Sequence, residues 1–113
     1  VHGRPPSFCT GCPERPIFSA MKLVERELGA HHVSCDIGCH LFSILPPFEI
    51  GATTMGYGLG WAGASALNTR ETGKRTISVM GDGGFWHNGL TSGVGNAVFN
   101  QSDNVLLIVD NAY

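Results

Sequence analysis

The sequence predicts an α/β fold, a parallel sheet with helices on both faces. Two runs rich in β-branched and aliphatic residues, 76–80 and 105–109, have the length and composition of strands that are covered on both sides. Between them, apolar residues recur at helical spacing. A strand, a helix and a second strand in this order form a βαβ unit, in which the two strands are parallel and the crossover is right-handed.

The helix between the two apolar runs is predicted from a short set of markers. Its apolar positions are Leu90, Val94, Ala97 and Val98. Asn88 is the predicted N-cap, because Asn favours that position, and the polar loop 100–104 ends the helix.

The N-terminal half supplies a further helix and strand to the same sheet. Prolines constrain the opening loop 4–16, and a helix follows with Gly29 as its C-cap. Its apolar face is Ile17, Met21, Val24 and Leu28. A short strand is predicted near 32–36, with Cys35 as a buried small side chain. Segment 51–67 is predicted to be a loop that leads into a closely packed helix with small side chains.

Composition limits the classes of partner. The 113 residues carry a formal net charge of −2, and the Lys and Arg residues are scattered, so we expect neither nucleic acid nor an acidic membrane as a partner. No apolar segment reaches transmembrane length and no signal-peptide pattern opens the chain, so we expect a cytoplasmic protein. Because 1–113 begins without Met, we expect part of a larger domain that needs more chain, or an oligomer, to cover its sheet.

Polar residues follow both apolar strands. Gly81, Asp82, Gly83 and Gly84 come after the first strand, and Asn111 follows the second. If these strands are neighbours, the crossover brings Asp82 and Asn111 to one carboxyl edge, about 5 Å apart in backbone spacing. Ligands of open α/β sheets bind at that edge.

The residue types at this edge suit a metal-bound phosphate. Mg²⁺ prefers oxygen ligands, and the Asp82 carboxylate, the Asn111 side-chain oxygen and the Tyr113 backbone carbonyl offer three. Gly83 and Gly84 let the backbone N–H groups approach a phosphate, at the positive end of the helix that follows. Gly-Asp-Gly alone is also an ordinary turn, and it is the combination with two strands, a helix and Asn111 that favours the site.

The pattern resembles the diphosphate-binding domain of thiamine diphosphate enzymes, in which GDG is followed by Asn-Asn. Asp110 replaces the first Asn here, which is similar to the 2-oxoacid:ferredoxin oxidoreductases. The resemblance implies thiamine diphosphate and Mg²⁺ as cofactors, with a cofactor contact at Gly56. The loop after the predicted strand near 32–36 is also directed to this edge. Its candidate cofactor-binding residues are Gly38, Cys39 and His40.

The spacing of Cys9 and Cys12 has three interpretations: a metal site, a redox dithiol, or two ordinary small residues. In the family that the chain resembles, cysteines matching Cys9, Cys12 and Cys39 help to bind a [4Fe–4S] cluster, whose fourth ligand would lie beyond Tyr113. The flanking residues resemble the indolepyruvate branch, whose known clusters belong to a separate ferredoxin-like domain. A cluster on these cysteines and a free-thiol loop over the cofactor therefore both remain open.

The resemblance implies oxidative decarboxylation of a 2-oxoacid such as indolepyruvate, with coenzyme A as acyl acceptor and ferredoxin as electron acceptor. A separate pyrimidine-binding domain or subunit would provide the activating glutamate. The alternatives are a non-oxidative thiamine diphosphate decarboxylase and a small Fe–S or metal-binding redox module. A dinucleotide-binding module is disfavoured, because no GxGxxG turn follows Met80.

Overall fold

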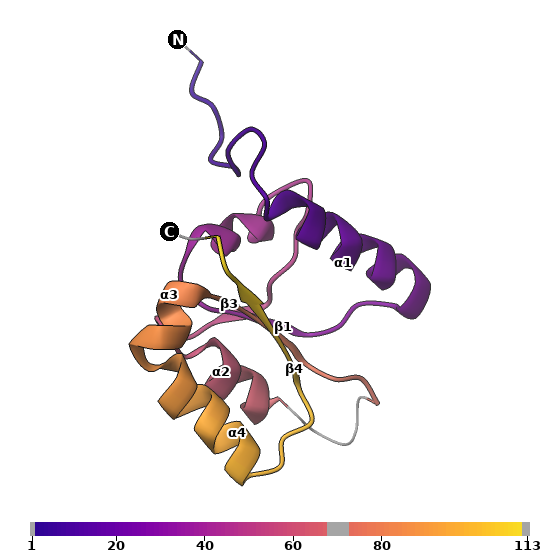
Figure 1. Cartoon of the computed structure of the whole chain (residues 1–113). Helices are drawn as coiled ribbons and strands as arrows, with labels where there is room; N and C mark the ends of the chain where they lie inside the picture. The colour runs from indigo at the N-terminus through magenta and orange to yellow at the C-terminus, as the bar shows by residue number, and fades with distance from the viewer. Residues whose placement is uncertain (1, 68–72, 112–113) are drawn as a thin grey trace.

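The computed structural model describes residues 2–67 and 73–111, and they form a four-stranded parallel sheet with helices on both faces (Figure 1). The strand order is β2-β1-β3-β4, and each neighbouring pair is parallel. The strands are β1 Val33–Cys35, β2 Thr53–Thr54, β3 Ile77–Gly81 and β4 Val105–Val109. The predicted fold class is confirmed.

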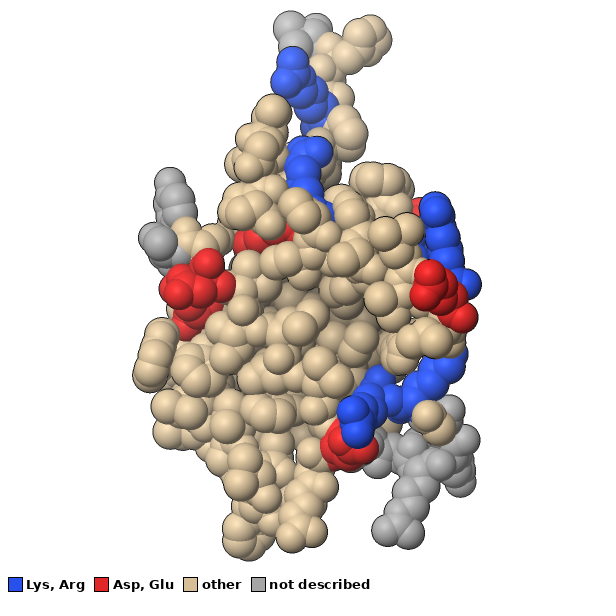
Figure 2. Space-filling view, turned by 45° about the vertical axis from the view of Figure 1, so that its right-hand side comes forward, with Lys and Arg blue, Asp and Glu red and all other residues tan. Residues whose placement is uncertain are grey.

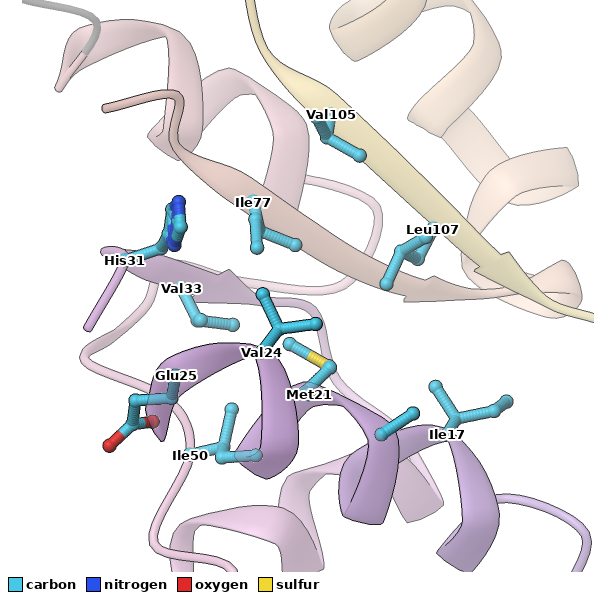
Figure 3. A pocket seen from close by; sticks show the side chains of 11 residues that line it. Ile17, Met21, Val24, Glu25, His31, Val33, Ile50, Ile77, Val105 and Leu107 are labelled. Atoms are coloured by element: carbon cyan, nitrogen blue, oxygen red, sulfur yellow. The ribbon is translucent and has the colours of Figure 1, made fainter. Parts of the chain in front are cut away.

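Helix α1, Arg15–Leu28, covers one face of the sheet. Pro16 lies in its first turn, where a missing N–H costs nothing, and the helix ends at Gly29, whose φ of 81° suits glycine. Figure 3 shows Ile17, Met21 and Val24 pointing from α1 toward strand side chains, across a cavity of about 430 Å³. Leu28 is 64% exposed, so the predicted apolar face ends before the last turn.

The other face is covered by α2, Gly60–Ala66, and by a continuous helical segment after β3. This segment consists of α3 Asp82–Gly84, the π-helical η2 Phe85–Val94 and α4 Gly95–Phe99. The prediction of Asn88 as N-cap was therefore wrong: the helix begins at Asp82, and Asn88 lies inside η2. Gly83 and Gly84 have low helix propensity, so the sequence does not indicate a helix start here. The same glycines allow the start of the helix to pack closely against neighbouring loops.

Side chains on the two faces of the sheet differ because strand residues alternate. Val33, Cys35, Val79 and Val109 join a buried apolar cluster on the α1 face. Phe8 and Phe18 stack in the same cluster, with ring centroids 5.4 Å apart. On the opposite face, the Ser34 hydroxyl donates to the Gly60 carbonyl oxygen at 2.7 Å, which confirms the predicted close packing of the small-residue helix.

The face of the molecule drawn in Figure 2 has few charged side chains at its centre. Figure 2 shows Lys, Arg, Asp and Glu side chains mainly around the margin of a broad uncharged area. Several large apolar side chains are exposed, including Trp86 at 72% and Phe99 at 85%. Across residues 2–67 and 73–111, no helix has both the length and the hydropathy needed to cross a membrane.

Candidate diphosphate and metal site

A cavity of about 190 Å³ lies at the carboxyl edge of the sheet. Five chain segments meet there: the residue before α1, the loop after β1 with η1 (Cys39–Ile44), the turn before α2, the end of β3 with the start of α3, and the end of β4. Most of the predicted site residues line it. The lining residues are Glu14, Ile37, Gly38, Cys39, His40, Tyr57, Gly81, Asp82, Gly83, Val109 and Asn111.

Strand register brings the two halves of the predicted motif together. Gly81 at the end of β3 is opposite Val109 at the end of β4. Asp82 and Asn111 therefore follow neighbouring parallel strands at the same edge, and both line the cavity. The predicted adjacency of these residues is confirmed.

The two glycines of α3, Gly83 and Gly84, have little room for a side chain. A Cβ on Gly83 would lie 2.6 Å from the Tyr57 hydroxyl oxygen, whereas one on Gly81 would meet no atom within 4 Å. No side chain caps the helix start at Gly81. The first N–H groups of the helical segment are thus available to an anion, and the helix dipole favours negative charge there.

Asp36 connects segments next to the cavity, although it is not among the lining residues. Its side chain is fully buried, and its Oδ1 accepts a hydrogen bond from the Gly58 backbone N–H at 2.6 Å. Its Oδ2 has no hydrogen-bond partner within the described part of the chain, and lies 2.2 Å from where a Cβ on Gly84 would be. His40 Nε2 donates to the Asp36 carbonyl oxygen at 2.7 Å. Asp36 therefore joins the loop after β1, the turn before α2 and the start of α3.

Glu14 is a site residue that the sequence reasoning missed. It immediately precedes α1, is 2% exposed and lines the cavity. Its Oε1 accepts a hydrogen bond from Asn111 Nδ2 at 3.1 Å, whereas Oε2 has no partner among residues 2–67 and 73–111. No pattern near Glu14 signals this contact, because its partner lies 97 positions along the chain.

Comparison with known proteins decides the family. Residues 36–113 match the family described as thiamine pyrophosphate enzyme, C-terminal TPP binding domain. The chain belongs to this family. Thiamine pyrophosphate is the thiamine diphosphate of the sequence-based prediction.

Curated relatives agree with the predicted branch. Indolepyruvate oxidoreductase subunit IorA of Pyrococcus horikoshii is 34% identical over 98% of this chain and 19% of its own length. The subunits of Methanothermobacter thermautotrophicus and Archaeoglobus fulgidus are 35% and 37% identical, each over 96% of the chain. The chain spans less than a fifth of the length of these relatives. No solved structure matches it significantly.

The residues present fit the diphosphate of this family's cofactor and a divalent cation. The uncapped helix start offers N–H donors, and Asp82 and Asn111 carry the oxygen atoms that Mg²⁺ prefers. Glu14 and Asp82 place two carboxyl groups in the same cavity. Such a cavity repels a diphosphate unless a cation lies with it, so the donor set favours a metal-bound diphosphate over a free one.

The cysteines of this thiamine pyrophosphate enzyme domain have different surroundings. Cys39 is exposed and lines the cavity, Cys9 is exposed, and Cys12 packs against the α1-side cluster. Arg15 holds the loop that contains Cys9 and Cys12. Its Nε–H donates a hydrogen bond to the Cys9 carbonyl oxygen at 3.0 Å, and its Nη2–H donates one to the Phe8 carbonyl oxygen. In the described ranges, no group of three or more His, Cys, Asp and Glu residues is placed to hold a metal ion. An iron–sulfur cluster on Cys9, Cys12 and Cys39 stays a prediction.

Cys35 is buried, as predicted. Burial raises the pKa of its thiol to about 11, against a smaller lowering by a hydrogen bond with Ser43, and the nearby Asp36 charge raises it further. Cys35 is thus a protonated core residue at neutral pH.

Three further predicted contacts are not settled by the cavity, and the first is that of Gly84, which is not among the lining residues. Gly56 is not among its lining residues, and a Cβ there would lie 3.2 Å from Leu59 Cδ1. Its cofactor contact stays a prediction. Tyr113, the predicted source of a carbonyl ligand, lies outside the described residues.

Proposed function

We propose that this chain holds the diphosphate end of thiamine diphosphate through Mg²⁺, as part of the diphosphate-binding domain of a longer enzyme. One observation supports this above all: the glycines at the end of β3 and the start of α3 line the same cavity as Asn111 after β4, within the segment that matches the family. The combination joins phosphate-binding N–H groups to oxygen ligands for a cation.

Each residue of the cavity has a distinct role in this proposal. Asp82 and Asn111 bind the cation through side-chain oxygens, and the Tyr113 carbonyl adds a third ligand. Gly81, Gly83 and Gly84 keep the backbone open to the diphosphate. Gly38, Cys39 and His40 also line the cavity and would orient the cofactor. When bound, thiamine diphosphate supplies the carbon nucleophile and the electron sink for decarboxylation of a 2-oxoacid.

For the whole enzyme, we propose a cytoplasmic, oligomeric 2-oxoacid oxidoreductase that acts on indolepyruvate or another aryl pyruvate. The names of the relatives, indolepyruvate oxidoreductase, support the substrate class and the oxidative outcome. Coenzyme A would take the acyl group and ferredoxin the electrons. A pyrimidine-binding domain or subunit would complete the cofactor site, because this chain covers only a small part of the relatives' length.

The test is turnover by the full-length protein with indolepyruvate, phenylpyruvate or pyruvate. We expect ferredoxin reduction that requires thiamine diphosphate, Mg²⁺ and coenzyme A, and that is fastest with an aryl pyruvate. Release of CO₂ and an aldehyde without an electron acceptor would instead establish a non-oxidative decarboxylase. No CO₂ release from any 2-oxoacid would refute the proposed activity.

A further inference from the structure

Glu14 has an unusual position for a carboxylate. It is almost fully buried at the start of α1, yet no cationic side chain pairs with it in the described contacts. Its one side-chain hydrogen bond among the described residues is to Asn111, and its second oxygen is unpartnered. Burying a carboxylate costs free energy unless its oxygen atoms are satisfied. A buried acid at this point of the cavity therefore calls for a functional reason.

The contact between Glu14 and Asn111 determines which way the amide faces. An amide carries both an acceptor oxygen and a donor NH₂, whereas an ionised carboxylate only accepts hydrogen bonds. Asn111 must therefore turn its NH₂ to Glu14 Oε1, and its own Oδ1 is left for another partner. A cation requires that oxygen, because the NH₂ group of an amide cannot bind it.

We propose that Glu14 is a positioning residue, which fixes the Asn111 amide so that its oxygen faces the metal of the diphosphate site. This inference rests on the proposed function of the cavity and deepens it. The interaction joins the loop that contains Cys9 and Cys12 to the end of β4, so the N-terminal segment takes part in building the cation site. The unpartnered Oε2 leaves Glu14 able to accept one more hydrogen bond inside the cavity.

Two substitutions at Glu14 separate the effect of its hydrogen-bond acceptor from the effect of its side-chain volume. Glu14→Met keeps a long side chain but removes the acceptor, and apolar replacement of a buried charge is often tolerated by folding. Glu14→Gln keeps an acceptor but adds a donor, so the Asn111 amide can hydrogen-bond to it in either orientation. Glu27→Gln, on an exposed position of α1, is the matched control.

The readout is binding of Mn²⁺, a paramagnetic substitute for Mg²⁺, to the full-length protein with saturating thiamine diphosphate. Loss of a residue that orients a metal ligand typically weakens metal binding by roughly 10- to 100-fold. We expect a loss in that range for Glu14→Met, a smaller one for Glu14→Gln, and none for Glu27→Gln. Circular dichroism checks folding; if Glu14→Met does not fold, Glu14→Gln replaces it in all comparisons.

A double-mutant cycle with Asn111→Ala distinguishes positioning from general support of the fold. If Glu14 acts through Asn111, its substitution has no further effect on Mn²⁺ affinity once Asn111 is Ala. Full, additive losses would overturn the inference, as would Glu14 variants that bind Mn²⁺ like Glu27→Gln. Failure of the proposed function is recognised separately, because the unmodified protein would then show no Mn²⁺ binding that requires both Asp82 and the cofactor.

Discussion

Gly84→Ala tests the close approach on which the site is built. The added Cβ would lie 2.2 Å from Asp36 Oδ2, so either the Asp36 carboxylate or the start of α3 must move. Moving Asp36 breaks its hydrogen bond from the Gly58 N–H, a contact to a charged group that contributes about 1.5–3 kcal/mol. Alanine regains about 1 kcal/mol of helix propensity over glycine. The net local destabilisation is therefore about 0.5–2 kcal/mol, from the difference of these two terms.

Hydrogen exchange of the full-length protein, followed in peptides that contain Gly58 and the start of α3, measures this loss. We expect roughly 2- to 30-fold faster exchange for Gly84→Ala, which is the factor for about 0.5–2 kcal/mol. Gly81→Ala is the control, because its Cβ meets no atom within 4 Å. In an Asp36→Ala background, Gly84→Ala should no longer destabilise. Equal exchange in the Gly84 and Gly81 variants, or a loss that persists without Asp36, would refute the steric reasoning.

Three further predictions concern the residues around the site. Because the folded Cys35 thiol keeps its proton up to a pKa of about 11, against 9.0 in its ordinary state, its contribution to stability is complete below pH 9 and is lost as pH rises toward 11. Cys35→Ala should flatten that decrease in alkaline unfolding curves, and an unchanged slope would contradict the assignment. Arg15→Lys cannot reproduce the guanidinium's two carbonyl contacts, so maleimide should label Cys12 several-fold faster; equal labelling rates would count against a bracing role for Arg15. Gly51 has a φ of 125°, and a Cβ there would lie 2.9 Å from Cys35 Sγ. Gly51→Ala should therefore lower the thermal unfolding temperature by several degrees, about what a loss of 1 kcal/mol or more produces, and an unchanged temperature would argue against strain.

Local sequence was enough to predict the central strands and their shared edge. The runs that became β3 and β4 are rich in aliphatic and β-branched residues, and a βαβ connection leaves one topology for their neighbouring ends. The end of α1 at Gly29 was equally local, since a positive φ favours glycine. The shared position of Asp82 and Asn111 at one edge of the sheet followed from these elements alone.

Tertiary contacts decided what local patterns could not. The helix start at Asp82 contradicts glycine propensity, and it depends on the packing of Gly84 over Asp36. The two-residue strand β2 is too short to give a period of its own. The role of Glu14 is visible only when α1 and β4 are placed together, because neither segment signals the other.

Titration calorimetry of thiamine diphosphate into the full-length protein tests the central claim most directly. We expect binding that requires Mg²⁺ and is abolished by chelator or by Asp82→Ala, because the cation neutralises the carboxylates and the diphosphate together. Asn111→Ala should weaken it by roughly 10- to 100-fold, the range for a damaged metal site. Binding that survives both substitutions with unchanged affinity would contradict the assignment of this cavity to the cofactor diphosphate.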